Sequence, residues 1–162
     1  MATMPTAAHP LGGMIRQMHH TAVSVRDFDA ARDFFVDVLG FAVEGEARAR
    51  DEPALGEVVG LPGAVVDWAM LARGEDRIEL FRYHQPEGRM EPAEQCDVGY
   101  VHIAMQVDDV DAAYDAALAA GFRTRSSPRS LRGGRTRVFY MIGPEGLVVE
   151  FIEFRAETGE SR

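Results

Sequence analysis

The fold is decided by a repeat: residues 20–31 read HTAVSVRDFDAA, and residues 102–113 read HIAMQVDDVDAA. Each copy begins with a histidine, reaches a valine five residues later and continues to a Gly-Phe pair that starts at Gly40 or at Gly121. The distance from valine to glycine is fifteen residues in the first copy and fourteen in the second. So many shared positions in one register indicate an internal duplication. Two copies of one unit predict a site with paired ligands.

The composition limits the class of protein. A chain of 162 residues, 46% of them hydrophobic, can form one compact domain or two small modules that share a sheet. The single cysteine excludes an internal disulfide, the first 13 residues lack the features of a secretory signal, and no apolar stretch approaches the roughly 20 residues that span a bilayer. The net charge of −9 argues against nucleic acid, which requires a basic face. We therefore expect a soluble cytoplasmic protein.

The basic residues are all arginine, which removes lysine chemistry. Because none of the 17 is lysine, Schiff-base and lysine general-base mechanisms are excluded. Six arginines crowd into residues 123–137. One interpretation is a solvated loop that balances an acidic chain. The other is a gate in which arginines such as Arg132 and Arg135 bind a carboxylate or phosphate of the substrate.

Both copies predict the same order of elements, which is a strand, a helix and three more strands. The first copy predicts a helix at 28–38, an insertion at 51–60 and strands at 18–25, 41–49, 64–72 and 77–83. In this helix Phe28, Ala31, Phe35 and Val38 recur at spacings of three and four, which predicts one buried apolar stripe. The second copy predicts a helix at 110–119 with Asp109 as its N-cap and strands at 100–107, 121–126, 136–142 and 147–154.

This order predicts an α+β protein made of two βαβββ modules. The first module occupies residues 15–83 and the second residues 99–155. They are joined by a linker at 84–98, which is rich in Pro, Glu and Gly. We expect the polar ends of the chain, residues 1–14 and 156–162, to be disordered tails.

Strand alternation predicts where the two histidines point. In the second copy Ile103 and Met105 share an apolar face that can pack beneath the helix, so His102 points the other way. The first copy has the same pattern, with Val23 under the helix and His20 on the opposite side. Both histidines are therefore expected on the helix-free face of their sheet.

Each copy also ends in a strand that carries one glutamate among apolar residues, Glu79 in the first and Glu150 in the second. Burying a carboxylate without a cation is too costly to be incidental. Taken singly, a strand histidine is more often a hydrogen-bonded core residue, and Glu79 could pair with Arg77 or Arg82. Together and in register they predict one site for a divalent Ni, Co, Zn, Mn or Fe ion with positions open to substrate. Its ligands are His20, Glu79, His102 and Glu150. His19 is left outside this set because its strand parity is opposite to that of His20, and His9 and His84 are left outside because they have no counterpart in the other copy.

These residues resemble the vicinal oxygen chelate superfamily, which includes glyoxalase I, methylmalonyl-CoA epimerase, extradiol dioxygenases and the fosfomycin and bleomycin resistance proteins. The resemblance covers about residues 18–154. It rests on the two repeat stretches, on FFVDVLGF at 34–41, on IEL at 78–80 and on GPEGLVVE at 143–150. It implies a glyoxalase-like fold, in which paired modules curl into a cup around a metal, and a homodimer. It also implies that the same two histidines and two glutamates are the metal ligands.

Two positions depart from or discriminate within this family. Gly143 and Leu147 stand where relatives usually carry the first Asp and the Asn of the turn before the last strand. Glu79 looks like glyoxalase I, because methylmalonyl-CoA epimerases typically have Gln there and extradiol dioxygenases use two His and one Glu. The chain has no clear glutathione-binding signature.

The resemblance implies a metal-dependent lyase or isomerase that acts on a small carbonyl compound. The metal would acidify the proton α to the carbonyl and hold the enediolate that forms. By resemblance to glyoxalase I the base would be Glu150, with Glu79 sharing the task.

Two alternatives stay open. An extradiol-type dioxygenase would use Fe²⁺ and a nearby base such as Tyr140 or His84, although a fourth ligand at Glu79 argues against it. A ligand-sequestering resistance protein without catalysis would line its cup with Trp68 and other aromatic residues. Trp68 and Tyr140 are therefore substrate-binding candidates. The substrate, the metal, and whether the site lies within one chain or across a dimer are not decided by these residues.

Overall fold

The computed structural model describes residues 14–90, 94–99 and 101–155. The chain divides into two compact units. Unit 1 comprises the segment up to Phe28 together with Phe35–Pro86, and unit 2 comprises Asp29–Phe34 together with the segment from Glu87 onward. Apart from Met14, the expected tails lie outside the described residues. No helix in the described part of the chain is long and apolar enough to cross a membrane.

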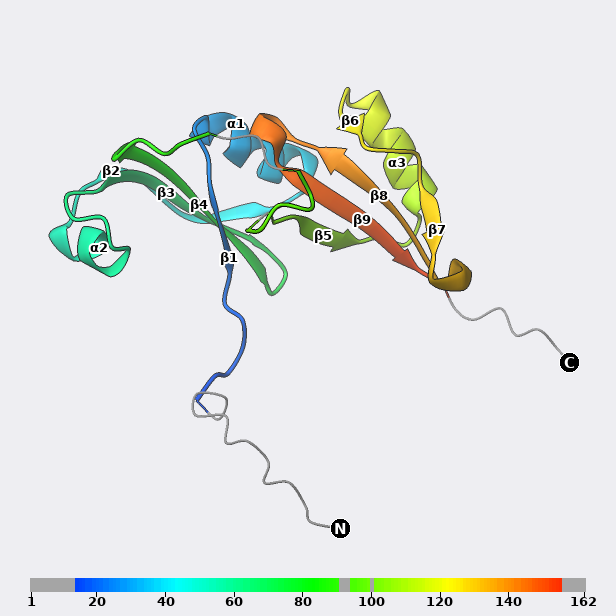
Figure 1. Cartoon of the computed structure of the whole chain (residues 1–162), viewed down its shortest axis with the longest axis horizontal. Helices are drawn as coiled ribbons and strands as arrows, with labels where there is room; N and C mark the ends of the chain where they lie inside the picture. The colour runs from blue at the N-terminus through cyan, green and yellow to red at the C-terminus, as the bar shows by residue number, and fades with distance from the viewer. Residues whose placement is uncertain (1–13, 91–93, 100, 156–162) are drawn as a thin grey trace, which may run out of the picture. The chain divides into compact units, whose positions relative to one another are not determined.

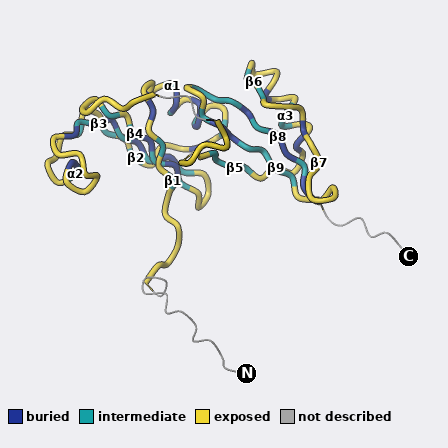
Figure 2. The backbone as a smooth tube through the Cα atoms, in the orientation of Figure 1, coloured by how far each residue is buried: buried dark blue, intermediate teal, exposed yellow. Residues whose placement is uncertain are grey.

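Unit 1 contains a four-stranded sheet in the order β1-β4-β3-β2 (Figure 1). Strand β1 pairs parallel to β4, and the other pairs are antiparallel. A short helix, α2, lies between β2 and β3 in the sequence, and most of it is exposed (Figure 2). The bounds are Thr21–Ser24 for β1, Ala42–Arg50 for β2, Pro53–Val58 for α2, Val65–Arg73 for β3 and Asp76–Gln85 for β4. Because Val65 pairs with Gln85, β4 continues two residues past the predicted end of its strand.

The helix predicted at 28–38 exists, but it changes type halfway. It is an α-helix over Phe28–Asp33 (α1) and a π-helix over Phe34–Val38 (η1). Phe28 and Phe35 are fully buried, as predicted, whereas Val38 is 44% exposed. The prediction for Val38 was wrong because it assumed 3.6 residues per turn, and a π turn rotates the following residues away from that stripe.

Unit 2 contains a second sheet in the order β5-β9-β8-β6, with β7 also paired to β8. As in unit 1, the first strand, β5, pairs parallel to the last, β9. Helix α3 contacts β8, β9 and β6, and the predicted N-cap is confirmed: the side chain of Asp109 accepts a hydrogen bond from the backbone N–H of Ala112 at 2.9 Å. The bounds are Ile103–Gln106 for β5, Val110–Ala119 for α3, Arg123–Thr124 for β6, Arg129–Leu131 for β7, Arg132–Gly134 for the 3₁₀ turn η2, Thr136–Ile142 for β8, Pro144–Gly146 for η3 and Val148–Phe154 for β9.

Strand β7 was not predicted, because its sequence shows no apolar alternation. It lies in the segment interpreted as an arginine-rich loop, and its three residues pair with the first three residues of β8. β7 forms because the edge of β8 is free to pair with it at this point, and a local sequence pattern does not show such a pairing.

Each sheet buries the face opposite its histidine. In unit 1 Leu71, Ile78 and Leu80 are at most 4% exposed. In unit 2 the fully buried Phe139 stacks on Phe151 with ring centroids 5.0 Å apart, and Tyr114 of α3 meets it edge-on at 5.3 Å. Residues of the other parity, which include both glutamates, are therefore presented on the helix-free side.

Gly143 is explained by packing within unit 2. A Cβ atom at this position would lie 2.8 Å from Cζ of Phe34, whose ring also meets Phe122 with centroids 5.5 Å apart. A residue with a side chain at this position, such as aspartate, would clash with this buried ring.

Candidate functional site

The first candidate pair lies at the edge of the sheet in unit 1. Glu79 is on β4 and pairs in register with Ala22 of β1, two residues after His20. Nε2 of His20 lies 3.0 Å from Oε2 of Glu79, and the Glu79 side chain is 15% exposed. The neighbours of Glu79 on β4, Ile78 and Leu80, point into the core. Strand alternation therefore places the carboxylate on the helix-free face, next to the imidazole.

Trp68 provides a second contact to this carboxylate. Its indole Nε1–H donates a hydrogen bond to Oε1 of Glu79 at 2.6 Å. Trp68 lies on β3 opposite Phe81, diagonally across from Glu79 and on the same face. From the sequence, Trp68 was expected only to line a substrate cup. The signal for this contact in the sequence is parity, which places Trp68 on the same face as Glu79. Diagonal neighbours on a sheet face are within reach, and a half-buried indole N–H needs a hydrogen-bond acceptor.

His19 also contacts this pair, although it was left outside the ligand set because of its parity. Its Nδ1 lies 2.9 Å from Nδ1 of His20, with the rings edge-on. The parity argument does not apply here, since β1 begins at Thr21 and both histidines precede it. One Nδ1 must carry a proton and the other must accept it. If His20 is the donor, its Nε2 could bind a metal ion once the contact with Glu79 is replaced, as in metal-binding histidines whose other nitrogen donates a hydrogen bond.

Unit 2 repeats the pair in the same register. Glu150 on β9 pairs with Ala104 of β5, again two residues after the histidine. Nε2 of His102 lies 3.1 Å from Oε2 of Glu150, whose side chain is 13% exposed. The ring of Tyr140 meets the His102 ring edge-on, with centroids 5.4 Å apart.

The neighbours of the two glutamates differ. Across the ladder, Glu79 faces Met70, whereas Glu150 faces Tyr140. The position that Trp68 holds relative to Glu79 is held by Val138 relative to Glu150. Among the residues that the structure describes, none donates a hydrogen bond to Oε1 of Glu150.

The structure does not bring Arg132 and Arg135 to the pair in unit 2. Arg132 begins the η2 turn, and Nε of Arg135 donates to its carbonyl oxygen at 3.2 Å. This turn precedes β8, and Tyr140 lies four residues beyond Thr136. Four residues of strand span about 13 Å, so the turn lies toward the other end of β8.

Tyr83 and His84 follow Glu79 on β4 but do not contact it. Tyr83 packs on Phe81 with ring centroids 5.7 Å apart. Burial, and secondarily the charge of Glu79, raise the pKa of Tyr83, so its phenol stays protonated at neutral pH. His84, considered as the base of a dioxygenase, instead binds Asp67 on the opposite face.

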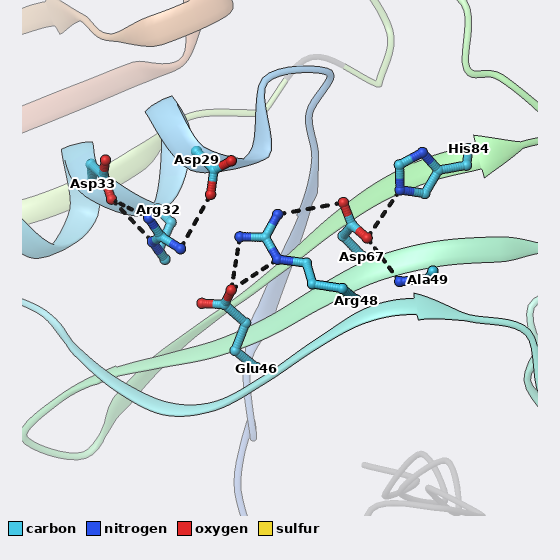
Figure 3. Close-up of polar contacts among 8 residues, drawn as sticks. All are labelled: Asp29, Arg32, Asp33, Glu46, Arg48, Ala49, Asp67 and His84. Atoms are coloured by element: carbon cyan, nitrogen blue, oxygen red, sulfur yellow. Dashed lines mark hydrogen bonds and ion pairs between the residues drawn. The ribbon is translucent and has the colours of Figure 1, made fainter.

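Asp67 is the centre of a polar cluster that was not predicted from the sequence (Figure 3). Its side chain accepts a hydrogen bond from the backbone N–H of Ala49 at 2.9 Å and lies 3.0 Å from Nε2 of His84 and 3.5 Å from Nη1 of Arg48. Ala49 has a φ of 49° and lies where the pairing of β2 with β3 shifts register. Burial raises the pKa of Asp67, but the hydrogen bonds from Ala49 and His84 outweigh it and lower the pKa below its ordinary value. This cluster stabilises an irregular strand.

The donor chemistry fits a divalent transition metal. Each unit supplies one imidazole nitrogen and one carboxylate oxygen 3.0–3.1 Å apart. Two neighbouring ligands that each lie about 2.1 Å from one ion have a similar separation. Within residues 14–90, 94–99 and 101–155, no group of three or more His, Cys, Asp or Glu side chains is gathered as a metal site. Each unit by itself therefore offers two donors, one imidazole and one carboxylate.

Comparison with known proteins identifies the relatives of this chain. Residues 17–151 match the model of the Glyoxalase/Bleomycin resistance protein/Dioxygenase superfamily. A 2-epi-5-epi-valiolone epimerase from an Actinomyces species is 32% identical over 149 residues, which is 86% of this chain and 80% of the relative. A lactoylglutathione lyase from Haemophilus influenzae is 28% identical over 138 residues, covering 85% of this chain and 92% of the relative.

The fold comparison agrees. A glyoxalase family protein from Bacillus cereus superposes with a TM-score of 0.77 at 25% identity, covering 88% of this chain and 96% of that one. The resemblance drawn from the repeat motifs and the predicted α+β glyoxalase-like fold are therefore confirmed. The chain belongs to the Glyoxalase/Bleomycin resistance protein/Dioxygenase superfamily.

Proposed function

We propose that this protein is a metal-dependent lyase or isomerase that removes the proton α to the carbonyl of a small molecule. The observation that carries the proposal is the duplicated His–Glu pair, which has the same register and nearly the same N–O distance in both units. A lyase and an epimerase among the relatives support it.

The residues that would hold the ion are His20, Glu79, His102 and Glu150, and the ion would be divalent Ni, Co, Zn, Mn or Fe. Two carboxylates balance its charge, and imidazole with carboxylate suits these metals. When bound, the ion supplies Lewis-acid stabilisation of the negative charge that develops on the substrate oxygen atoms. We propose that the two units contribute to one site, within a chain or across a homodimer.

The proton transfer is assigned to Glu150. Its Oε2 faces His102, whereas no described residue donates to Oε1, which leaves this oxygen able to take a proton from carbon and return it. A base at this position must come within hydrogen-bond reach of the α-carbon in the bound substrate. Tyr140, beside the histidine, is the candidate to orient the substrate.

The test combines metal analysis with isotope exchange. The purified protein is assayed for bound metal, and candidate α-hydroxy and α-keto carbonyl compounds are incubated with it in D₂O, before and after removal of metal by a chelator. The expected result is incorporation of deuterium at the α-carbon that is lost with the metal and restored by adding it back. Oxygen uptake with a catechol would instead identify a dioxygenase, and ligand binding without exchange would identify a sequestering protein. Either of these results overturns the proposal.

A further inference from the structure

The two glutamates of the candidate site are held differently. In unit 1 both oxygens of Glu79 have partners, Oε2 with His20 and Oε1 with the indole of Trp68. In unit 2 the Glu150 carboxylate contacts His102, but among the described residues none donates a second hydrogen bond to it, because Val138 stands in the place of Trp68. The duplicated ligands are thus unequal in their freedom to move.

We propose that Trp68 is a positioning residue that fixes Glu79 as a one-oxygen ligand and thereby leaves proton transfer to Glu150, an inference that rests on the proposed function. An indole N–H is a donor only, and its bond to a carboxylate is charge-assisted. With Oε1 held at 2.6 Å from Nε1, only Oε2 is presented beside the histidine. Glu79 can then neither bind through both oxygens nor swing toward a substrate.

The indole is itself held by the sheet. Gly45 of β2 lies beneath it, and a Cβ atom there would be 3.2 Å from two carbons of the six-membered ring. The guanidinium of Arg50 lies over the ring, 5.5 Å from its centroid. The absence of a side chain at Gly45 lets the ring lie close to the backbone of β2, with its N–H directed at Glu79. Loss of either the N–H or this close approach should therefore loosen the carboxylate.

The experiment uses the full chain, stripped of metal and titrated with Co²⁺. Trp68 is the only tryptophan, so the intrinsic fluorescence of the wild type reports directly on this position. Binding of paramagnetic Co²⁺ should quench it, and the visible absorption bands of Co²⁺ report the ligands. Trp68→Phe removes the N–H and keeps an aromatic ring. Arg50→Gln is the matched control, since it removes a contact of the same ring and keeps the N–H.

We expect Trp68→Phe to bind Co²⁺ 10- to 100-fold more weakly, the usual effect of losing a partner of a metal ligand, and with altered visible bands. Arg50→Gln should match the wild type in affinity and bands. Gly45→Ala, which keeps Trp68 but crowds its ring, should weaken binding in the same direction by a smaller factor. Circular dichroism checks that each variant folds, and Gly45→Ala carries the test if Trp68→Phe does not fold.

The outcomes separate this inference from the function on which it rests. A wild type that binds no Co²⁺ and shows no quenching contradicts the metal site itself. A wild type that binds Co²⁺, with Trp68→Phe equal to it in affinity and in bands, leaves the metal site intact and overturns the positioning role. That second result would mean that the hydrogen bond merely satisfies the indole N–H.

Discussion

The two halves of this protein share their donors and differ in what surrounds them. Both place a histidine Nε2 3.0–3.1 Å from a glutamate oxygen, with the glutamate paired to the residue two places after the histidine. Beside these donors unit 1 carries Trp68 and Met70, and unit 2 carries Val138 and Tyr140. A duplication first produces equal ligands. The two ligands can then acquire different roles through substitutions at neighbouring positions of the sheet alone.

The largest expected difference between the halves concerns the two glutamates. Glu150→Gln should lower the rate of deuterium exchange by about 10²- to 10⁴-fold, the usual contribution of a general base. Glu79→Gln should lower it less at saturating metal, because its role is to bind the ion. The measurement is exchange at a metal concentration that saturates each variant. A larger loss in Glu79→Gln than in Glu150→Gln would reverse the proposed roles.

Unlike the two glutamates, the two histidines should contribute equally to the affinity for the metal ion. Removing either ligand, in His20→Ala or His102→Ala, should weaken metal binding by more than about 100-fold, since losing an outer partner alone costs 10- to 100-fold. Calorimetric titration with Co²⁺ measures this. If only one of the two variants loses affinity, the two pairs do not share an ion.

A third comparison concerns the opposite face of each sheet. Asp67 is buried in unit 1, whereas the residue at the same place relative to the glutamate in unit 2 is Arg137, which binds the exposed Asp111 of α3 at 2.6 Å. Asp67→Asn should lower the free energy of unfolding by about 1–3 kcal/mol, because it weakens hydrogen bonds to a buried group. Asp111→Asn should have a smaller effect, since exposed ion pairs contribute little. Urea unfolding at neutral pH measures both.

The same residue predicts a pH dependence. The pKa of Asp67 is lowered in the folded protein, so its ionised form stabilises the fold at pH values above the ordinary aspartate pKa. This contribution should disappear as the pH falls through the lowered pKa. The wild type and Asp67→Asn should therefore converge in stability in acid and diverge toward neutral pH. A constant difference between them at all pH values would show that the charge of Asp67 plays no part.

The smallest expected effect sharpens the comparison of the two helices. Helix α3 is regular and begins at a side-chain cap from Asp109, whereas the first helix changes to a π-helix at Phe34. Asp109→Ala should lower the free energy of unfolding by about 1 kcal/mol, the usual value of an N-cap. Asp109→Asn should restore most of it, because asparagine also caps well. Equal losses in the two variants would indicate that the cap hydrogen bond is not what stabilises α3.

Local patterns predicted the elements well where one face of a strand is apolar. The alternation around Ile103 and the apolar run around Glu150 were sufficient for β5 and β9. They failed for β7, which forms by pairing with another strand, and at Val38, where the helical period changes. They also missed Trp68, His19 and Asp67 as polar partners, because these contacts depend on how strands pair and where β1 begins.

The sequence by itself determined the duplication, the type of each module, the family and the face of the strands on which the two glutamates lie. It could do so because side-chain direction on a strand follows from position alone. Only the tertiary structure decided which groups bind each glutamate, because hydrogen bonds between strands depend on register. The same register brings Trp68, an indole donor, beside Glu79 and the apolar Val138 beside Glu150. The inequality of two carboxylates that are equivalent in the repeat is therefore a property of the folded sheets.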